Sequence, residues 1–194
     1  MPRTPMPAPA PEPARDPSTT LLTGLPPVLG DDARVLVLGS MPGVRSLDEA
    51  CYYAHPRNAF WPIVGSLIGQ PPTGPYAARL DALRERGIAL WDVIGRCRRA
   101  GSLDSRIEPD SVEVNDLGGL IDRCPQLTLI AFNGARAEQE FDRRVLPQLG
   151  HGARAIRRVR LPSTSPANAA LGVEEKRRAW HAALGPALVP AGGG

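Results

Sequence analysis

The chain has 194 residues, 42% of them hydrophobic and 22% charged, which are ordinary proportions for a globular protein of one domain or two small ones. It contains no apolar run near the ~20 residues of a membrane helix, and its proline-rich N-terminus has no hydrophobic signal segment, so we expect a cytoplasmic protein that is neither membrane-embedded nor exported. The formal net charge is +3, and 22 of the 23 basic residues are arginines, a balance that by itself does not establish binding to nucleic acid.

Two scarce residue types limit the chemistry that the chain can perform. Its three cysteines, Cys51, Cys97 and Cys124, are too few and too scattered for a disulfide framework, a zinc knuckle or a four-cysteine iron–sulfur cluster. We therefore expect reduced, buried thiols and predict no metal and no cofactor. The single lysine, Lys176, lies far in the sequence from the loops described below, and arginine cannot replace it as a Schiff-base amine.

The two ends of the chain are expected to lie outside the folded part. Residues 1–17 hold seven of the 22 prolines and show no core-forming periodicity, which predicts a disordered tail. Residues 189–194 end in three glycines and are expected to fray. A single domain is predicted between them, over residues 18–188.

Short β-like runs alternate with helical patterns along this domain. The runs predict strands over residues 34–38, 88–93, 127–132 and 155–161. Apolar residues at helical spacing predict helices over 58–68, 76–86, 116–123, 134–145 and 173–184, with Asn133 as a candidate N-cap of the fourth. Strands that alternate with helices in this way form a parallel sheet covered on both faces, so the fold class is α/β.

The loops that begin at Gly39, Asp92, Asn133 and Pro162 follow these four strands, where parallel sheets place their functional groups. The first reads GSMPG, whose glycines permit a tight turn and a close approach of ligand to backbone. It lacks the ending of a phosphate-binding Walker loop and the GxGxxG pattern of a dinucleotide turn. A structural turn and a ligand-binding loop remain equal alternatives for it.

Aromatic residues are interleaved with arginine and asparagine over residues 51–61, a pattern typical of a pocket for a planar, hydrogen-bonding ligand such as a nucleobase. Phe60 and Trp61 begin the apolar face of a predicted helix and are expected in the core. Tyr53, His55 and Asn58 have no evident core role, so we assign them to function. Asn58 has the alternative of being a simple helix N-cap.

Charged and hydroxyl-bearing residues follow the second and fourth strands. Asp92 either accepts hydrogen bonds from the N–H groups of a base or forms a cap or salt bridge with nearby arginines, and these alternatives are balanced. The arginines at 96–99 either contact phosphates or face solvent. After the fourth strand, two prolines bracket three hydroxyl residues, a stiff loop suited to holding phosphates or wedging a duplex. The predicted DNA-binding residues are Arg160, Ser163, Thr164, Ser165, Pro166, Ala167 and Asn168.

Five segments taken together resemble the hypoxanthine-DNA (deoxyinosine) glycosylase branch of the uracil-DNA glycosylase superfamily. They are GSMPGVRSL, YYAHPRNAFW, WDVIGRCRRAGSLDSRI, AFNG and LPSTSPAN, in the right order between about Arg34 and Trp180. The resemblance implies a three-layer α/β/α sandwich on a four-stranded parallel sheet. It also implies a monomeric, cofactor-free and monofunctional enzyme of base excision repair. Such an enzyme binds DNA containing deaminated bases, flips the damaged base out and hydrolyses its N-glycosidic bond without a lyase step.

The resemblance also assigns roles to individual residues. Met41 stands where many members of the superfamily carry a catalytic Asp or Asn, and a thioether cannot activate water. The catalytic role is therefore carried over to Asn58, with His55 beside it. Tyr53 aligns with an aromatic residue that stacks on the flipped base, and Asp92 with a residue that reads the base edge. The first loop supplies the other base-binding residues, Gly39, Ser40, Met41, Pro42 and Gly43.

Two other functions stay open at this point. One is a uracil or mismatch-specific uracil glycosylase with shifted catalytic residues. The other is a non-catalytic module that binds damaged DNA and has lost its first-loop carboxylate. The motifs leave open the preferred base, the preference for single or double strands, and whether Asn58 or Asp92 contributes more to catalysis.

Overall fold

The computed structural model describes residues 20–188. The predicted tail over residues 1–17 and the predicted frayed end over 189–194 lie outside the described residues. None of the helices between residues 20 and 188 is long and apolar enough to cross a membrane.

Four parallel strands form the central layer of the protein. Their order across the sheet is β3 (Ile88–Asp92), β2 (Val35–Gly39), β6 (Leu129–Asn133) and β7 (Arg157–Leu161). Each begins and ends within two residues of the strand predicted for it, so the four-stranded parallel sheet is confirmed. The interior strand β2 is buried over its whole length, which explains why its sequence is a continuous apolar run.

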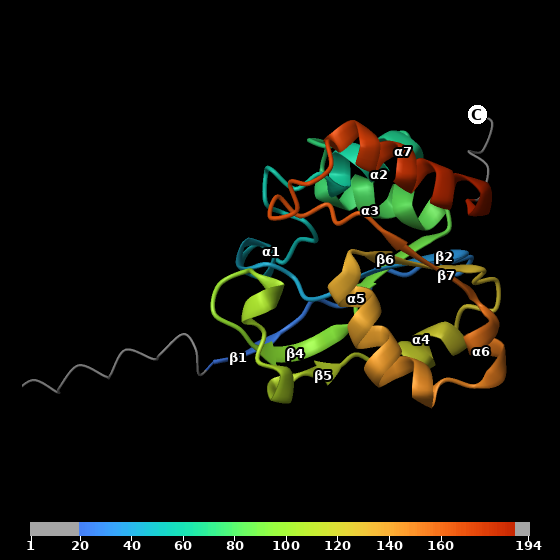
Figure 1. Cartoon of the computed structure of the whole chain (residues 1–194). Helices are drawn as coiled ribbons and strands as arrows, with labels where there is room; N and C mark the ends of the chain where they lie inside the picture. Colours follow the sequence, from blue (N-terminus) through green and yellow to red (C-terminus); the bar gives the residue numbers. More distant parts are fainter. Residues whose placement is uncertain (1–19, 189–194) are drawn as a thin grey trace, which may run out of the picture.

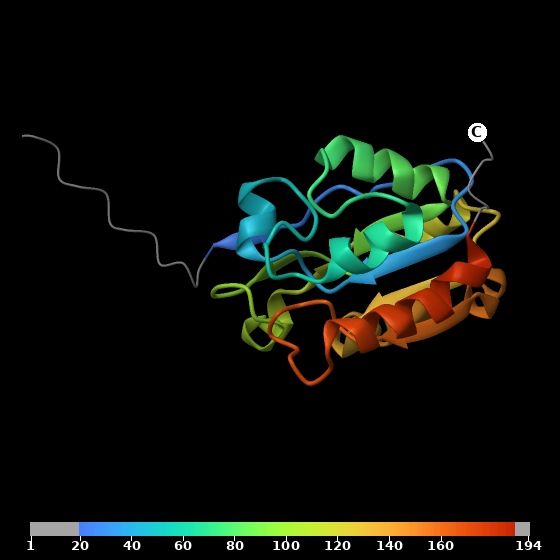
Figure 2. The ribbon, with the colours of Figure 1, turned by 90° about the horizontal axis from the view of Figure 1, so that it is seen from above.

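Helices cover both faces of this sheet (Figure 1), and the predicted α/β/α sandwich is confirmed. One face carries α2 (Phe60–Ile68), α3 (Tyr76–Glu85) and α7 (Val173–Leu184). The opposite face carries α4 (Leu117–Asp122), α5 (Ala135–Glu140) and α6 (His151–Ala155). Figure 2 shows the first group of helices seen from above, lying over the strands.

The alternation of side chains along the strands builds a separate apolar core on each face. Val35 and Val37 of β2 point to the core under α2, α3 and α7. Leu36 and Leu38 point to the core under α4 and α5, because successive side chains of a strand face opposite sides. Phe60, which is fully buried, lies in the first core as predicted, and so does Trp61.

A second, antiparallel sheet was not predicted. Its order is β1 (Leu21–Thr23), β4 (Ile94–Arg98) and β5 (Glu113–Val114). Only Val93 separates β3 from β4, so one continuous stretch of chain passes from the first sheet into the second. Buried residues of β4 are interspersed with two exposed arginines, and this hides a short strand from a search for apolar runs.

The remaining elements are short. They are α1 (Val44–Asp48), a π-helical turn (Phe141–Val145) and 3-10 turns over Asp104–Arg106, Pro109–Ser111, Leu146–Gln148 and Gly185–Ala187. The helix predicted over 134–145 is thus α5 followed by the π-helical turn. All three cysteines are free thiols, and Cys51, unlike the other two, is partly exposed rather than buried.

The strand register brings the four predicted loops to one edge of the central sheet. Gly39 at the end of β2 pairs with Asp92 at the end of β3, and Asn133 at the end of β6 pairs with Leu161 of β7. The four strands therefore stop at nearly the same level, and the loops after them meet there. This is the edge at which open parallel sheets bind their ligands.

Candidate active site

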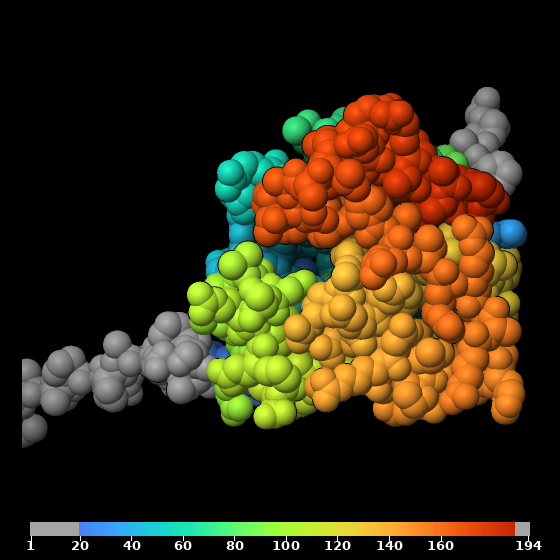
Figure 3. All heavy atoms as spheres, viewed as in Figure 1, coloured from blue at the N-terminus to red at the C-terminus, as the bar shows by residue number. Residues whose placement is uncertain are grey.

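A cavity of about 480 Å³ opens at the carboxyl edge of the central sheet. Figure 3 shows a hollow here, with lime-green residues near 100, gold residues of α5 and orange-red residues beyond 161 at its rim. Every predicted site residue except Arg160 lines the cavity: residues 39–43, Tyr53, His55, Asn58, Asp92 and residues 163–168. The fold thus brings together segments that lie more than a hundred residues apart in the sequence.

Asp92 presents a buried carboxyl group to this cavity. The residue is 3% exposed, and its Oδ2 has no hydrogen-bond partner. Burial, reinforced by the nearby Asp104 and opposed by Arg99, raises the pKa of Asp92 to about 8. The carboxyl is therefore mostly protonated at neutral pH and can both donate and accept a hydrogen bond.

Tyr53 places a second unpartnered polar atom beside that carboxyl. Its hydroxyl is buried without a hydrogen-bond partner, and its backbone φ of 54° lies in the left-handed region, which is rare for a tyrosine. Its ring stacks on Phe60, with the centroids 3.9 Å apart, so only the opposite face of the ring is left to stack on a base. Strained backbone and orphaned polar atoms are typical of functional sites.

Gly39 makes room for both groups. A Cβ atom at this position would collide with the Asp92 carboxyl and would lie 3.3 Å from the Tyr53 hydroxyl. A glycine is therefore required at the end of β2 for steric reasons, in addition to the tight turn that the sequence suggests. The first loop is a lining of the cavity and not only a turn.

Asn58 and His55 lie on the segment that enters α2. The Oδ1 of Asn58 accepts a hydrogen bond of 2.9 Å from the backbone N–H of Phe60, while Ala59 occupies the N-cap position. The oxygen of Asn58 thus supports the start of the helix, and the side chain still lines the cavity. The Nδ1 of His55 accepts a hydrogen bond from the Arg57 N–H, so the proton of a neutral ring lies on Nε2.

Two residues that were not assigned to the site, Arg99 and Asp104, hold the first loop in place. Arg99 is 2% exposed, and its guanidinium donates hydrogen bonds to the backbone carbonyls of Met41, Pro42 and Gly101. The Asp104 carboxylate accepts hydrogen bonds of 2.8 Å from the Ser40 hydroxyl. These contacts anchor the first loop to the chain that follows β4.

The prediction that the arginines at 96–99 face phosphates or solvent is wrong for Arg99. Arg96 and Arg98 are exposed, whereas Arg99 and Cys97 are buried. The two-residue period of β4 continues through Arg99 and places it on the inner face with Cys97. Recognising β4 as a strand would have identified Arg99 as a buried residue.

Met41 contributes to packing as well as to the cavity wall. It is 6% exposed and belongs to a small apolar cluster with Ile94, Cys97 and Ile107. Its side chain therefore fills the space between the first loop and the second sheet. This agrees with the sequence argument that a methionine here does no acid–base chemistry.

The loop of residues 163–168 is fixed at Thr164. Asn133 donates to the Thr164 hydroxyl at 2.9 Å and accepts from the Thr164 N–H at 2.8 Å. The Thr164 carbonyl accepts a further bond from the Ala59 N–H. Asn133 is therefore not the predicted N-cap of α5, because Gly134, with φ of 99°, takes that position. The tip of the loop, Pro166 and Ala167, stays exposed.

Lys176 lies beside this loop, although it is distant from most of the cavity residues in the sequence. It is 4% exposed, and its Nζ donates a hydrogen bond of 2.6 Å to the Asn168 carbonyl. The expectation that it is remote from every cavity loop is therefore wrong. The ammonium group is used to fix the end of the 163–168 loop.

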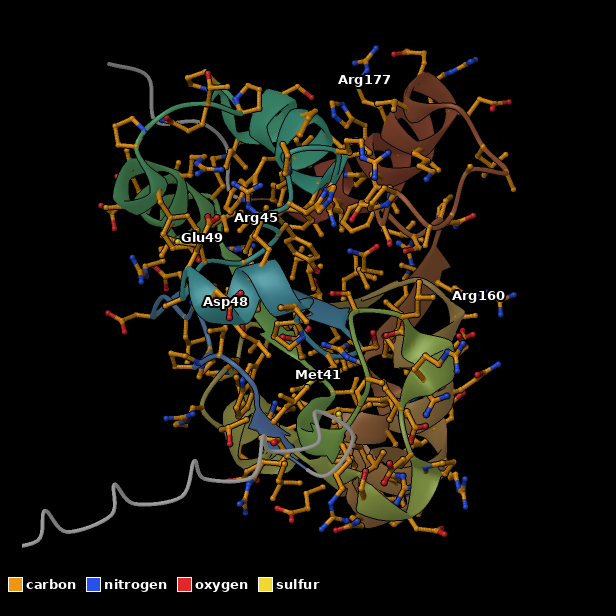
Figure 4. The ribbon with its side chains drawn as sticks, turned by 90° about the vertical axis from the view of Figure 1, so that its left-hand side faces the viewer. Met41, Arg45, Asp48, Glu49, Arg160 and Arg177 are labelled. Carbon is orange, nitrogen blue, oxygen red and sulfur yellow. The ribbon has the colours of Figure 1, made fainter. Side chains whose placement is uncertain are left out.

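Arg160 is the predicted site residue that the structure does not bring to the cavity. Its side chain is 56% exposed and pairs with Glu138 at 3.1 Å. Figure 4 shows it at the edge of the molecule, pointing away from the loop that carries Met41. Any contact of Arg160 with DNA lies outside the cavity.

Comparisons with known proteins agree with this arrangement. The chain is 40% identical over 115 residues to a hypoxanthine DNA glycosylase of Methanosarcina barkeri, which covers 59% of this chain and 72% of that protein. It is 38% identical over 146 residues to a hypoxanthine DNA glycosylase of Methanosarcina acetivorans, covering 75% and 87%.

A solution NMR structure of a candidate uracil DNA glycosylase from Methanosarcina acetivorans superimposes with a TM-score of 0.70 at 34% identity, covering 84% of this chain and 96% of that one. The family model of the uracil DNA glycosylase superfamily matches residues 26–184. The fold and the family that the sequence motifs predict are thereby confirmed. The chain belongs to the uracil DNA glycosylase superfamily.

Proposed function

We propose that this protein is a monofunctional DNA glycosylase that hydrolyses the N-glycosidic bond of hypoxanthine in deoxyinosine-containing DNA. One observation carries the proposal. Tyr53, Asn58 and Asp92 converge in a single cavity at the carboxyl edge of the sheet, in a chain 38–40% identical to proteins named hypoxanthine DNA glycosylase. We further propose that a single domain over residues 18–188 carries this activity, as a monomer in the cytoplasm.

Hypoxanthine offers hydrogen-bond partners to the buried Asp92 carboxyl and a flat surface to the Tyr53 ring. Its six-membered ring presents the O6 acceptor next to the N1–H donor. A protonated Asp92 carboxyl donates to O6 and accepts from N1–H, while the free face of the Tyr53 ring stacks on the base. A buried polar atom without a partner costs about 1–3 kcal/mol, so a base that satisfies Asp92 recovers part of that free energy on binding. The cavity is in the size range of small-molecule sites.

Bond cleavage follows a dissociative course in this proposal. The first loop carries no general base, so the C1′–N9 bond breaks before water attacks, and its electron pair passes to the purine. The sugar is left with oxocarbenium character, and water then adds to C1′ and loses a proton, which balances the proton that the departed purine anion takes up. Negative charge on the purine is shared with O6, where the hydrogen bond from Asp92 strengthens as the charge develops. Asn58 and His55 stabilise the departing base or orient the water.

DNA is held by the loops around the cavity. The hydroxyl groups of Ser163 and Ser165, which accept hydrogen bonds within the loop and can donate outward, bind phosphates, and Arg160 adds a contact outside the cavity. The fixed position of Thr164 and the exposed tip at Pro166 and Ala167 suit a loop that presses against a duplex.

The experiment uses duplexes that contain one deoxyinosine or one deoxyuridine, analysed before and after hot alkali. We expect strand breaks at deoxyinosine that depend on alkali, because a monofunctional glycosylase leaves an intact abasic site. The Asn58→Ala variant is expected to lose about 10²–10³-fold in single-turnover rate, as loss of an oriented polar group at a developing charge does. The Arg177→Ala variant serves as a control, because this exposed side chain pairs with Glu174 and does not line the cavity, and it should keep its rate constant for excision.

Other outcomes would contradict the proposal. Cutting only at deoxyuridine would support a uracil glycosylase. Tight binding to the deoxyinosine duplex without any abasic product would support a non-catalytic damage-binding module. An Asn58→Ala variant with full activity would remove Asn58 from the catalytic residues.

A further inference from the structure

Thr164 connects two segments of the cavity wall that are remote in the sequence. It belongs to the proposed DNA-binding loop of residues 163–168, yet it is only 1% exposed. Its carbonyl accepts a hydrogen bond of 3.0 Å from the backbone N–H of Ala59, the residue directly after Asn58. The loop that meets DNA is therefore bonded to the segment that carries Asn58.

Asn133 fixes Thr164 from the central sheet. It is the last residue of β6, where it pairs with Leu161 of β7. Its Nδ2 donates to the Thr164 hydroxyl at 2.9 Å, and its Oδ1 accepts from the Thr164 N–H at 2.8 Å. Both ends of one side-chain amide thus bind one residue, which fixes the orientation of Thr164 as well as its position.

Two side chains of α7 anchor the same stretch of chain at its two ends. Trp180 donates from Nε1 to the Pro162 carbonyl at 3.0 Å, and Lys176 donates from Nζ to the Asn168 carbonyl at 2.6 Å. Neither of these two hydrogen bonds involves the segment before α2. Truncating Lys176 therefore loosens the loop but leaves that segment in place, which makes Lys176→Met a contrast variant.

The backbone of Asn58 is held from both sides. Its own N–H donates to the His55 carbonyl at 2.8 Å, and the next N–H, that of Ala59, is the one bound by Thr164. Its Oδ1 accepts from the Phe60 N–H, so the Nδ2 donor is the end of the amide that remains for the cavity. A donor to a developing negative charge must be placed accurately, and a misplacement of about 1 Å costs on the order of 100-fold in rate. The bonds that hold this short segment therefore affect the rate of cleavage.

We propose that Asn133 is a positioning residue, which through Thr164 holds Asn58 at the place where it acts on the departing base. This inference rests on the proposed function, because Asn58 receives its catalytic role there. Asn133 acts through Asn58 and does not itself contact the reacting bond. Contact of DNA with the 163–168 loop acts on the same chain of hydrogen bonds, so that binding of phosphates and placement of Asn58 are coupled.

The first experiment separates the rate of excision from the binding of DNA. Asn133→Ala should lower the single-turnover rate at saturating deoxyinosine duplex about 10- to 100-fold, with little change in KM. Lys176→Met should show the reverse, a rise in KM with little change in that rate. Thr164→Ser keeps every hydrogen bond of the link and should keep the wild-type rate, whereas Thr164→Val loses only the hydroxyl bond and should show an intermediate rate. Thermal melting checks that each variant is folded, and a rise in KM alone for Asn133→Ala would overturn the proposal.

A double-mutant cycle tests whether Asn133 acts through Asn58. If it does, its effect disappears when the Asn58 side chain is absent. The double variant Asn58→Ala, Asn133→Ala should then be as slow as Asn58→Ala alone, within about twofold, which is the usual error of such a cycle. A residue that contacts the base directly, or one that only stabilises the fold, causes the same loss in both backgrounds. Equal losses in the two backgrounds would therefore overturn the proposal.

A further measurement follows the link without any excision. Hydrogen exchange of the Ala59 amide, measured by NMR in the free protein, reports whether the Thr164 carbonyl still accepts its hydrogen bond. We expect faster exchange of this amide in Asn133→Ala than in the wild type, whichever base the enzyme excises. Equal exchange in the two proteins would refute the role of Asn133, while absence of excision of deoxyinosine by the wild type would refute the proposed function alone.

Discussion

Replacing Asp92 by asparagine tests whether a neutral carboxyl at the cavity floor reads the base. Asp92→Asn keeps the shape of the side chain, and an amide donates and accepts hydrogen bonds much as a protonated carboxyl does. It removes the titration, because an amide does not ionise. The groups that act on this titration are Asp104, which raises the pKa of Asp92, and Arg99, which lowers it.

The magnitude follows from the shift in pKa, from an ordinary 3.8 to about 8. Between these values the unfolded carboxyl is ionised while the folded one stays protonated, so the unfolded state binds fewer protons and the free energy of unfolding falls as pH rises. Each pH unit in this window is worth about 1.4 kcal/mol, which gives an upper limit of about 6 kcal/mol for the total loss. Asp92→Asn lacks this loss, so its free energy of unfolding should exceed that of the wild type increasingly from pH 5 to pH 8.

Activity is expected to follow the same ionisation. The ionised carboxylate of the wild type cannot donate to O6 and repels the charge that develops there, so kcat/KM should fall above about pH 8. Asp92→Asn should keep most of its activity at pH 7 and show no fall near pH 8. The assay is single-turnover excision of deoxyinosine between pH 5.5 and 9.5, with urea unfolding over the same range. Asp92→Ala, which lacks both donor and acceptor, serves as the inactive reference.

Two results would refute this reasoning. A fall in kcat/KM above pH 8 that persists in Asp92→Asn would show that another group titrates. An Asp92→Asn variant as inactive as Asp92→Ala at every pH would show that the carboxyl does more than a neutral donor and acceptor can.

Three further predictions concern Gly39, Lys176 and the absence of a lyase step. Gly39→Ala should lower the free energy of unfolding by about 1–3 kcal/mol, measured by urea unfolding, and should reduce excision sharply, because the new Cβ displaces the Asp92 carboxyl. A Gly39→Ala variant with unchanged activity would show that the close approach of Gly39 to Asp92 is not needed for catalysis. Lys176→Met should raise KM for duplex DNA severalfold with little change in kcat, because the Asn168 carbonyl loses the bond that fixes the 163–168 loop. The same assay, with borohydride added, should trap no covalent adduct on wild-type protein, and an adduct at Lys176 would contradict the monofunctional proposal.

Local sequence patterns were sufficient for the central layer and for the position of the site. A strand buried on both faces is apolar along its length, so β2 and β6 can be recognised in the sequence as runs of apolar residues. Once the strands are known, the parallel topology places the loops after Gly39, Asp92, Asn133 and Leu161 at one edge. That rule depends on connectivity alone and does not require knowledge of packing.

The contacts that complete the site could not be predicted, because each joins segments remote in the sequence. Ser40 and Asp104 are 64 residues apart, and Asn133 and Thr164 are 31 apart. The periodicity of apolar residues also does not reveal a buried charge. Arg99 resembles its exposed neighbours in sequence, and only the carbonyl groups of the first loop give its guanidinium partners inside the protein.

The sequence by itself determined the α/β fold, the family and many of the residues that line the cavity, because these depend on runs of strand-forming residues and on motifs in a given order. The tertiary structure alone decided the chemical state of the site. The elevated pKa of Asp92, the orphaned hydroxyl of Tyr53 and the buried position of Thr164 arise from what surrounds each side chain in three dimensions. Burial is a property of the whole fold, and it sets whether a carboxyl is an acid or an anion.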